Sequence, residues 1–191
     1  MVTGTTLLTI RAADLGAAGP LLRASTQAGD PPPLLRESDA DGTSLPGQDP
    51  LVTLSAKNAS AVTVNAAVSW QLDLAGGTSR TLADLRGGQV SGVSVTAGAD
   101  AISLALPRTR GRVPVRLGAG ASQFLLGLPG GVPVRVTAAD GAGEVSPEGQ
   151  DHSGVAGGSV FTTPGWAPGA AGLDIDALAG AGRITVTARA S

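Results

Sequence analysis

Arginine side chains carry the clearest potential for binding chemistry in this sequence. Two copies of a Val-Pro-Val-Arg unit end in Arg116 and Arg135, and Arg112 directly precedes the first copy. The alternation expected of a strand turns all three arginines outward. If the two units were neighbours in a parallel stack, Arg116 and Arg135 would lie about 4.8 Å apart, which repels unless an anion or a carboxylate intervenes. We therefore predict that Arg116, Arg135 and Arg112 bind an anionic group or a partner.

The same charges also have a more ordinary interpretation. Asp73 and Asp176 occupy the corresponding outward position in other segments, so the row also fits a mixed-charge ladder with acids at its ends. Arg108 and Arg110, on the turn before Arg112, add to the positive charge. Both interpretations stay open at the level of sequence.

Catalytic chemistry has few candidates. The only histidine, His152, lies in a polar turn, and no Gly-x-Ser-x-Gly unit offers a nucleophile. Asp174 and Asp176 project from one face of a strand about 7 Å apart, a separation that inverting glycosidases use. A sugar subsite also needs aromatic platforms, and the sequence has no Tyr, two Phe and two Trp. We expect no catalytic residue, no metal site and no cofactor; the protein is predicted not to be an enzyme.

Composition restricts the partners further. The chain has 191 residues, a formal net charge of −2 and a single lysine, Lys57, so no overall field attracts nucleic acid. Cysteine is absent, which excludes disulfides and thiolate sites. No run of eighteen apolar residues would span a membrane, and no signal-peptide pattern is visible.

Side chains alternate with a period of two along most of the chain, which predicts half-buried strands. Val68, Trp70 and Leu72 face one way, and Val113 and Val115 repeat the pattern. Two further short strands are expected at residues 21–25 and 33–37, and strand pattern resumes at 51–54 and 62–64.

A glycine turn recurs at regular intervals and is followed by apolar residues four and six positions later. The turns begin at Gly77, Gly98, Gly120, Gly141 and Gly180. The first four follow one another at a nearly constant interval, and the step from Gly141 to Gly180 is close to two such intervals. This spacing predicts an all-β fold, a β-solenoid or β-helix-like stack of about 21-residue rungs. The alternative is a two-sheet β-sandwich.

The expected organisation is a single all-β repeat domain over residues 1–191. Residues 1–67 are predicted to form irregular N-terminal rungs with an exposed loop at 29–50. Residues 68–191 are predicted to form regular rungs, with an excursion near 157–172. We expect the N-terminal half-rung and Trp166 to cap the two open ends, or the chain to be a piece of a longer protein.

The residues also resemble a known family. Val113-Pro-Val-Arg-Leu-Gly-Ala-Gly-Ala-Ser122, the C-terminal segment from Pro164 to Val186 and the opening Leu8 to Leu15 resemble the putative-adhesin β-solenoid domains of actinobacterial envelope-associated proteins. The resemblance implies a repetitive β fold, attached at the cell envelope, without catalytic residues.

On these grounds we expect a non-enzymatic, cell-envelope-associated, adhesin-like structural or interaction module. Its partner would be a protein or an anionic envelope polymer. One alternative is a carbohydrate-binding or carbohydrate-active β-helix. Another is a sensory or regulatory domain of a membrane-linked stress-response protein. The sequence does not locate the protein beyond this envelope association.

Overall fold

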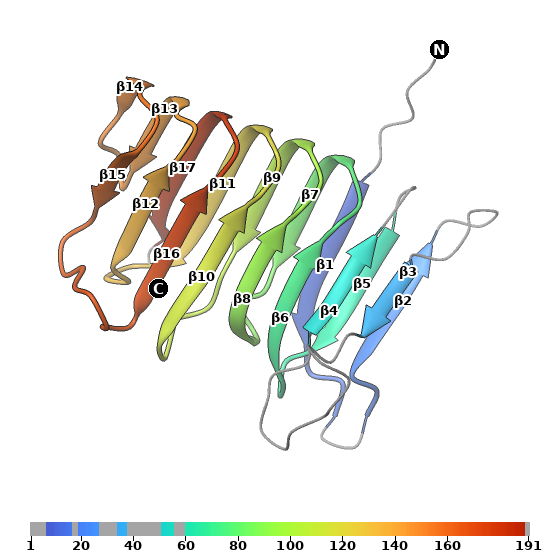
Figure 1. Ribbon diagram of the computed structural model, residues 1–191. Helices are drawn as coiled ribbons and strands as arrows, with labels where there is room; N and C mark the ends of the chain where they lie inside the picture. Colours follow the sequence, from blue (N-terminus) through green and yellow to red (C-terminus); the bar gives the residue numbers. More distant parts are fainter. Residues whose placement is uncertain (1–6, 17–18, 27–33, 38–50, 56–59, 190–191) are drawn as a thin grey trace, which may run out of the picture.

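The computed structural model describes residues 7–16, 19–26, 34–37, 51–55 and 60–189, and these contain strands and turns but no helix. No helix in these ranges could therefore cross a membrane. The strands form two mixed sheets (Figure 1). The chain is all-β, as predicted, and the two-sheet alternative fits.

The nine-stranded sheet contains, in spatial order, β14 (His152–Val155), β13 (Ala142–Pro147), β17 (Ala181–Arg189), β11 (Ala121–Pro129), β9 (Ala99–Ala105), β7 (Thr78–Asp84), β1 (Leu7–Ala13), β5 (Ser60–Asn65) and β2 (Leu22–Thr26). The eight-stranded sheet contains β15 (Ser159–Thr162), β12 (Val134–Ala138), β16 (Gly172–Ala177), β10 (Arg112–Leu117), β8 (Gln89–Val95), β6 (Ser69–Leu74), β4 (Leu51–Ser55) and β3 (Leu34–Glu37). β2, β3, β4 and β5 confirm the four short strands expected near the N-terminus. Apart from β3, the predicted loop at 29–50 lies outside the described residues.

From β6 to β13 the chain passes from one sheet to the other with every strand. Neighbouring strands of this region are parallel: Thr81 pairs with Ile102, and Ile102 pairs with Phe124. The glycine turns lie in a line, because the amide of Thr78 donates to the Gly98 carbonyl and that of Ala99 to the Gly120 carbonyl. The expected glycine spacing thus matches the register of these sheets.

The order of strands in space departs from their order in the chain at two places. β16 lies between β10 and β12, and β17 lies between β11 and β13 (Figure 1, red-orange). Gly180 therefore lies beside Gly120, and the amide of Ala181 donates to the Gly141 carbonyl. The step from Gly141 to Gly180 is close to two intervals along the chain, yet the two turns are neighbours in space, because the last pair of strands inserts before the preceding pair.

Short antiparallel strands close both ends of the sheets. β2 and β3 lie at one end, β14 and β15 at the other, and each runs antiparallel to its neighbour. Each has four or five residues, and short edge strands limit pairing with other chains. β1 lies inside the sheet, between β5 and β7, so the expected N-terminal cap was wrong.

The core lies between the two sheets and consists mainly of Val, Leu, Ile and Ala. Leu104, Leu126 and Val186 are in register and each is 1% exposed. Trp70 is fully buried, and its Nε1 donates to the Asn65 carbonyl at 2.8 Å. Trp166, expected to cover the apolar stack, is only half-buried and is not among the side chains packed against the core.

Candidate anion-binding surface

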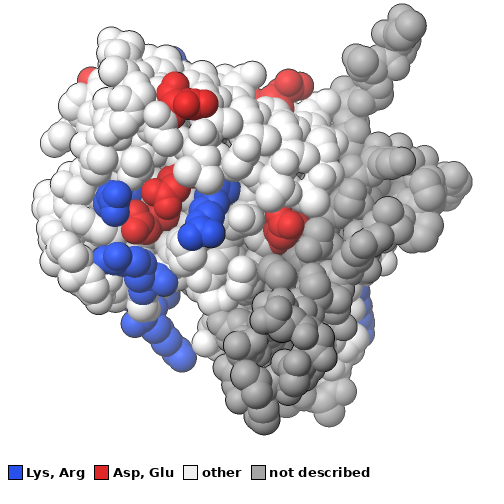
Figure 2. All heavy atoms as spheres, viewed as in Figure 1, with Lys and Arg blue, Asp and Glu red and all other residues white. Residues whose placement is uncertain are grey.

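Arg116 and Arg135 both lie on the outer face of the eight-stranded sheet, but they are not neighbours. β16 lies between their strands, so Arg116 is directly opposite Asp176, and Arg135 is directly opposite Asp174. Figure 2 shows basic and acidic side chains interspersed on this face. The expected adjacency was wrong because the insertion of β16 separates the two arginines by one strand.

Asp174 is the acid that separates the arginines. Its Oδ2 lies 3.6 Å from Nη1 of Arg135 and 3.9 Å from Nη1 of Arg112, and its side chain is 15% exposed. Its other oxygen, Oδ1, is buried without a hydrogen-bond partner among the described residues. The chain thus supplies its own carboxylate between two predicted anion-binding arginines, as the mixed-charge interpretation requires.

Arg112 is held from a second direction by the turn that precedes β16. Its guanidinium carbon lies 4.8 Å from the centroid of the Trp166 ring, and its Nη2 donates to the Ala167 carbonyl at 3.4 Å. A guanidinium over an indole face is a cation–π contact. Trp166 therefore positions an outward arginine instead of covering the core.

Arg116 differs from the other two predicted arginines. Its side chain is exposed, and it forms no ion pair within 4.0 Å among the residues that the structure describes. Of the three predicted residues, Arg116 thus presents its charge to solvent, whereas Arg112 and Arg135 share one carboxylate.

A pocket lies beside this row, where two adjacent strands diverge. The ladder between β6 and β8 shifts between Trp70 and Gln71, so that Ser91 is the additional residue of a β-bulge. β8 and β10 pair only from Val93 and Val115 onward. The space between the earlier parts of these strands is what we call the arginine pocket. It encloses about 330 Å³ and is lined by Ser69, residues 88–91 and residues 108–113.

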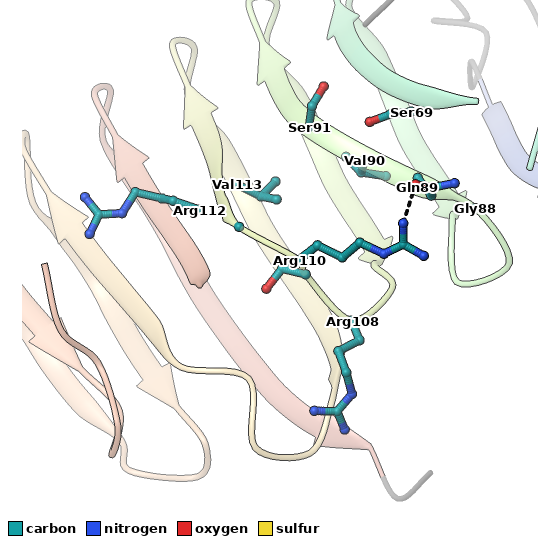
Figure 3. A pocket seen from close by; sticks show the side chains of 11 residues that line it. Ser69, Gly88, Gln89, Val90, Ser91, Arg108, Arg110, Arg112 and Val113 are labelled. Atoms are coloured by element: carbon teal, nitrogen blue, oxygen red, sulfur yellow. Dashed lines mark hydrogen bonds between the residues drawn. The ribbon is translucent and has the colours of Figure 1, made fainter. Parts of the chain in front are cut away.

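Among the described residues, the lining of the arginine pocket contains three basic side chains, Arg108, Arg110 and Arg112, and no acidic one. Arg110 extends toward Gln89 and donates to its Oε1 at 3.4 Å, whereas Arg108 and Arg112 extend away from Gln89 (Figure 3). Arg108 donates to the Gly130 carbonyl at 3.2 Å. The alternating arginines are visible in the sequence, but the bulge that opens the pocket is not.

His152 and its neighbour Asp151 have other contacts. The His152 ring stacks on Phe161 with centroids 4.6 Å apart, and Asp151 accepts a hydrogen bond from the Ser146 hydroxyl. Within the described part of the chain, no three His, Cys, Asp or Glu residues are grouped to hold a metal ion.

A clear electrostatic perturbation lies on the opposite sheet. Nε and Nη2 of Arg86 donate to the Asp84 carboxylate at 2.8 and 2.6 Å. These hydrogen bonds lower the pKa of Asp84 below its ordinary value, against the smaller effect of burial. The pair is exposed, and Asp84 is the last residue of β7 in the nine-stranded sheet, not in the sheet that carries Arg112, Arg116 and Arg135.

Comparison with known proteins identifies the fold but not the family. No protein-family model and no curated protein matches this sequence. A crystal structure of a "putative cell adhesion protein from Clostridium sporogenes ATCC 15579" is similar to this structure, with a TM-score of 0.57 and 17% sequence identity. The match covers 96% of this chain and 89% of that chain. At this identity the likeness shows a shared fold, over nearly the whole length of both chains.

Proposed function

We propose that this protein is a non-enzymatic, adhesin-like interaction module of the cell envelope. The observation that carries the proposal is the likeness in fold, over 96% of the chain, to a protein described as a "putative cell adhesion protein". The binding surface is the outer face of the eight-stranded sheet, with Arg116, Arg135 and Arg112. Its partner is an anionic polymer of the envelope.

The two sheets are proposed to be one short β-solenoid whose rungs have the length of the glycine-turn interval. Two observations support this solenoid. The chain alternates between the two sheets from β6 to β13, and parallel partners such as Thr81 and Ile102 are separated along the chain by one glycine-turn interval. In such a stack each rung contacts only its neighbours and presents an extended outer surface. An extended surface suits attachment to a polymer better than it suits enclosure of a substrate.

The non-enzymatic part of the proposal is supported by the contacts of the acidic residues. Asp174, which with Asp176 formed the candidate carboxylate pair, lies between two arginines at 3.6 and 3.9 Å. A general acid or base must contact the substrate, and this carboxylate instead contacts two guanidinium groups. His152, stacked on Phe161, lies on a different strand pair.

Retention on beads tests the proposal. The full chain should be retained on beads that carry an acidic polysaccharide, and not on beads that carry a neutral one. The double variant Arg116→Ala, Arg135→Ala should bind at least about tenfold more weakly, because a charge-assisted contact contributes about 1.5–3 kcal/mol. The matched control Arg23→Ala, Arg80→Ala removes the same charge from the nine-stranded sheet and should bind as the wild type does.

Two outcomes would overturn this proposal. Failure of the wild-type chain to bind the acidic beads would remove the proposed partner class. Equal loss of binding in the two double variants would show that net charge, rather than this face, controls retention.

A further inference from the structure

The arginine pocket carries an excess of positive charge that the residues described by the structure do not neutralise locally. Of the three arginines in its lining, Arg112 is offset by Asp174. Arg108 and Arg110 contact only neutral oxygens in the hydrogen bonds that the described residues make. A charged group that lines a pocket without a counter-charge favours an anionic ligand there.

Arg110 is the residue placed to bind that ligand directly. Its side chain reaches across to Gln89, at the end of the pocket where β8 begins (Figure 3). Among the described residues its guanidinium makes one hydrogen bond, a long one of 3.4 Å, to the neutral Gln89 Oε1. A guanidinium has five N–H donors in a planar fork, which fits both oxygens of a carboxylate.

A buried hydroxyl lies further along β8. Ser91, the additional residue of the bulge, has its Oγ buried without a hydrogen-bond partner among the described residues. Buried hydroxyls are normally satisfied by protein, water or a ligand. Val90 and Val113 add apolar surface to the lining between the two ends.

We propose that the arginine pocket binds one acidic sugar unit of an anionic glycan. The sugar's carboxylate would contact Arg110, and its ring hydroxyls would lie toward Ser91. A volume of about 330 Å³ is at the small end of the range of about 300–1,000 Å³ for small-molecule pockets, which suits a single unit. This inference rests on the proposed function, since it names the ligand class of the same binding face.

A titration followed by NMR tests the pocket on the full chain. ¹⁵N-labelled protein is titrated separately with glucuronic acid, glucose and inorganic phosphate. Glucuronic acid should shift the amide signals of residues 88–91 and 110–113, and glucose should bind at least tenfold more weakly because it lacks the carboxylate. Shifts confined to other residues, or phosphate binding as tightly as glucuronic acid, would overturn the proposal.

Three variants assign the interaction to the pocket. Arg110→Gln should weaken glucuronic acid binding at least tenfold, Arg110→Lys by less, and the control Arg80→Gln not at all. If Arg110→Gln keeps the NMR spectrum of the folded wild type and binds glucuronic acid with unchanged affinity, the proposed role of the pocket is also overturned. If Arg110→Gln binds glucuronic acid as the wild type does while acidic beads still retain the chain, the pocket fails and the proposed function stands. If the beads never retain the wild type, the proposed function fails.

Discussion

Two glycines at the start of the inserted β17, Gly180 in the turn before it and Gly182 within it, allow the insertion to be tested by measurements of stability. A Cβ at Gly182 would clash with the carbonyl oxygen of Ser122 on β11, whereas a Cβ at Gly180 would meet nothing within 4 Å. Neither glycine has a positive φ. Gly182→Ala and Gly180→Ala therefore add the same methyl group at nearby positions, one against the neighbouring backbone and one into open space.

The expected magnitudes follow from this difference. Overpacking against a site that cannot yield costs about 1–3 kcal/mol, and a backbone carbonyl cannot rotate away as a side chain can. Replacing Gly by Ala also restricts the unfolded chain, which stabilises by about 0.4–1 kcal/mol where no strain results. We expect Gly182→Ala to lose about 2 kcal/mol, and Gly180→Ala to be neutral or slightly more stable.

Thermal and urea unfolding followed by circular dichroism measure the two variants. In a chain of this size about 1 kcal/mol shifts Tm by about 2–4 °C, so Gly182→Ala should melt about 4–8 °C below the wild type. Gly143→Ala on β13, whose Cβ would lie 2.6 Å from the Gly182 carbonyl oxygen, should behave like Gly182→Ala. A Gly182→Ala variant as stable as Gly180→Ala would refute the packing of β17 against β11.

Further predictions concern the core, the charges and the arginine row. Trp70→Ala should lower the free energy of unfolding, measured by urea denaturation, by about 3–5 kcal/mol because the ring is fully buried. Trp166→Ala should lower it by less than about 1 kcal/mol because that ring is only half-buried, and equal losses would contradict this placement. Arg86→Ala should raise the pKa of Asp84 toward its ordinary value in an NMR titration. In the wild type, this pair stabilises the fold above the unfolded pKa of Asp84, about 3.9, and the stabilisation is lost as pH falls through the lowered folded pKa. The variant should lack this stabilisation. An unchanged pKa of Asp84 in the variant would show that Arg86 does not cause the shift. Asp174→Asn should strengthen retention on acidic beads because it leaves two arginines without their carboxylate; weaker retention would contradict the proposed role of that acid.

The strands and the core were predictable from sequence because they depend on local patterns. Alternation of apolar and polar residues decides which side chains face inward, whatever the order of the strands in space. Leu104, Leu126 and Val186 are therefore buried as the glycine spacing indicated. The copy that begins at Gly77 has the polar Thr81 at its first apolar position, and the buried hydroxyl of Thr81 is hydrogen-bonded to that of Thr78 at 2.8 Å.

The order of the strands was not predictable from these patterns. The segments bury similar valines and leucines, so hydrophobic burial alone permits several stacking orders. The stacking orders differ in which backbones come close together. In this structure a Cβ at Gly172 would lie 2.6 Å from the carbonyl oxygen of Pro133, and the sequence does not reveal that these two residues are neighbours. The available signal was electrostatic, since Asp174 and Asp176 complement Arg135 and Arg116 when β16 lies between them.

The candidate site was therefore only partly predictable. The outward direction of Arg112, Arg116 and Arg135 follows from alternation, but their neighbours depend on the inserted strand. The arginine pocket depends on the bulge at Ser91, an irregularity of one residue between β6 and β8. A one-residue irregularity of this kind changes no hydrophobic pattern strongly enough to be recognised in a single sequence.

Cysteine pairs in this cysteine-free chain test the strand order most directly. Arg183 is the register partner of both Gln123 and Glu144, so Gln123 and Glu144 lie two strands apart. Adjacent strands are about 4.8 Å apart and disulfides need Cα atoms within about 4.4–6.8 Å. The variant Gln123→Cys, Arg183→Cys should form an intramolecular disulfide on mild oxidation, and Gln123→Cys, Glu144→Cys should not. A disulfide in the second variant but not in the first would contradict the insertion of β17, and with it the placement of Asp174 among the arginines.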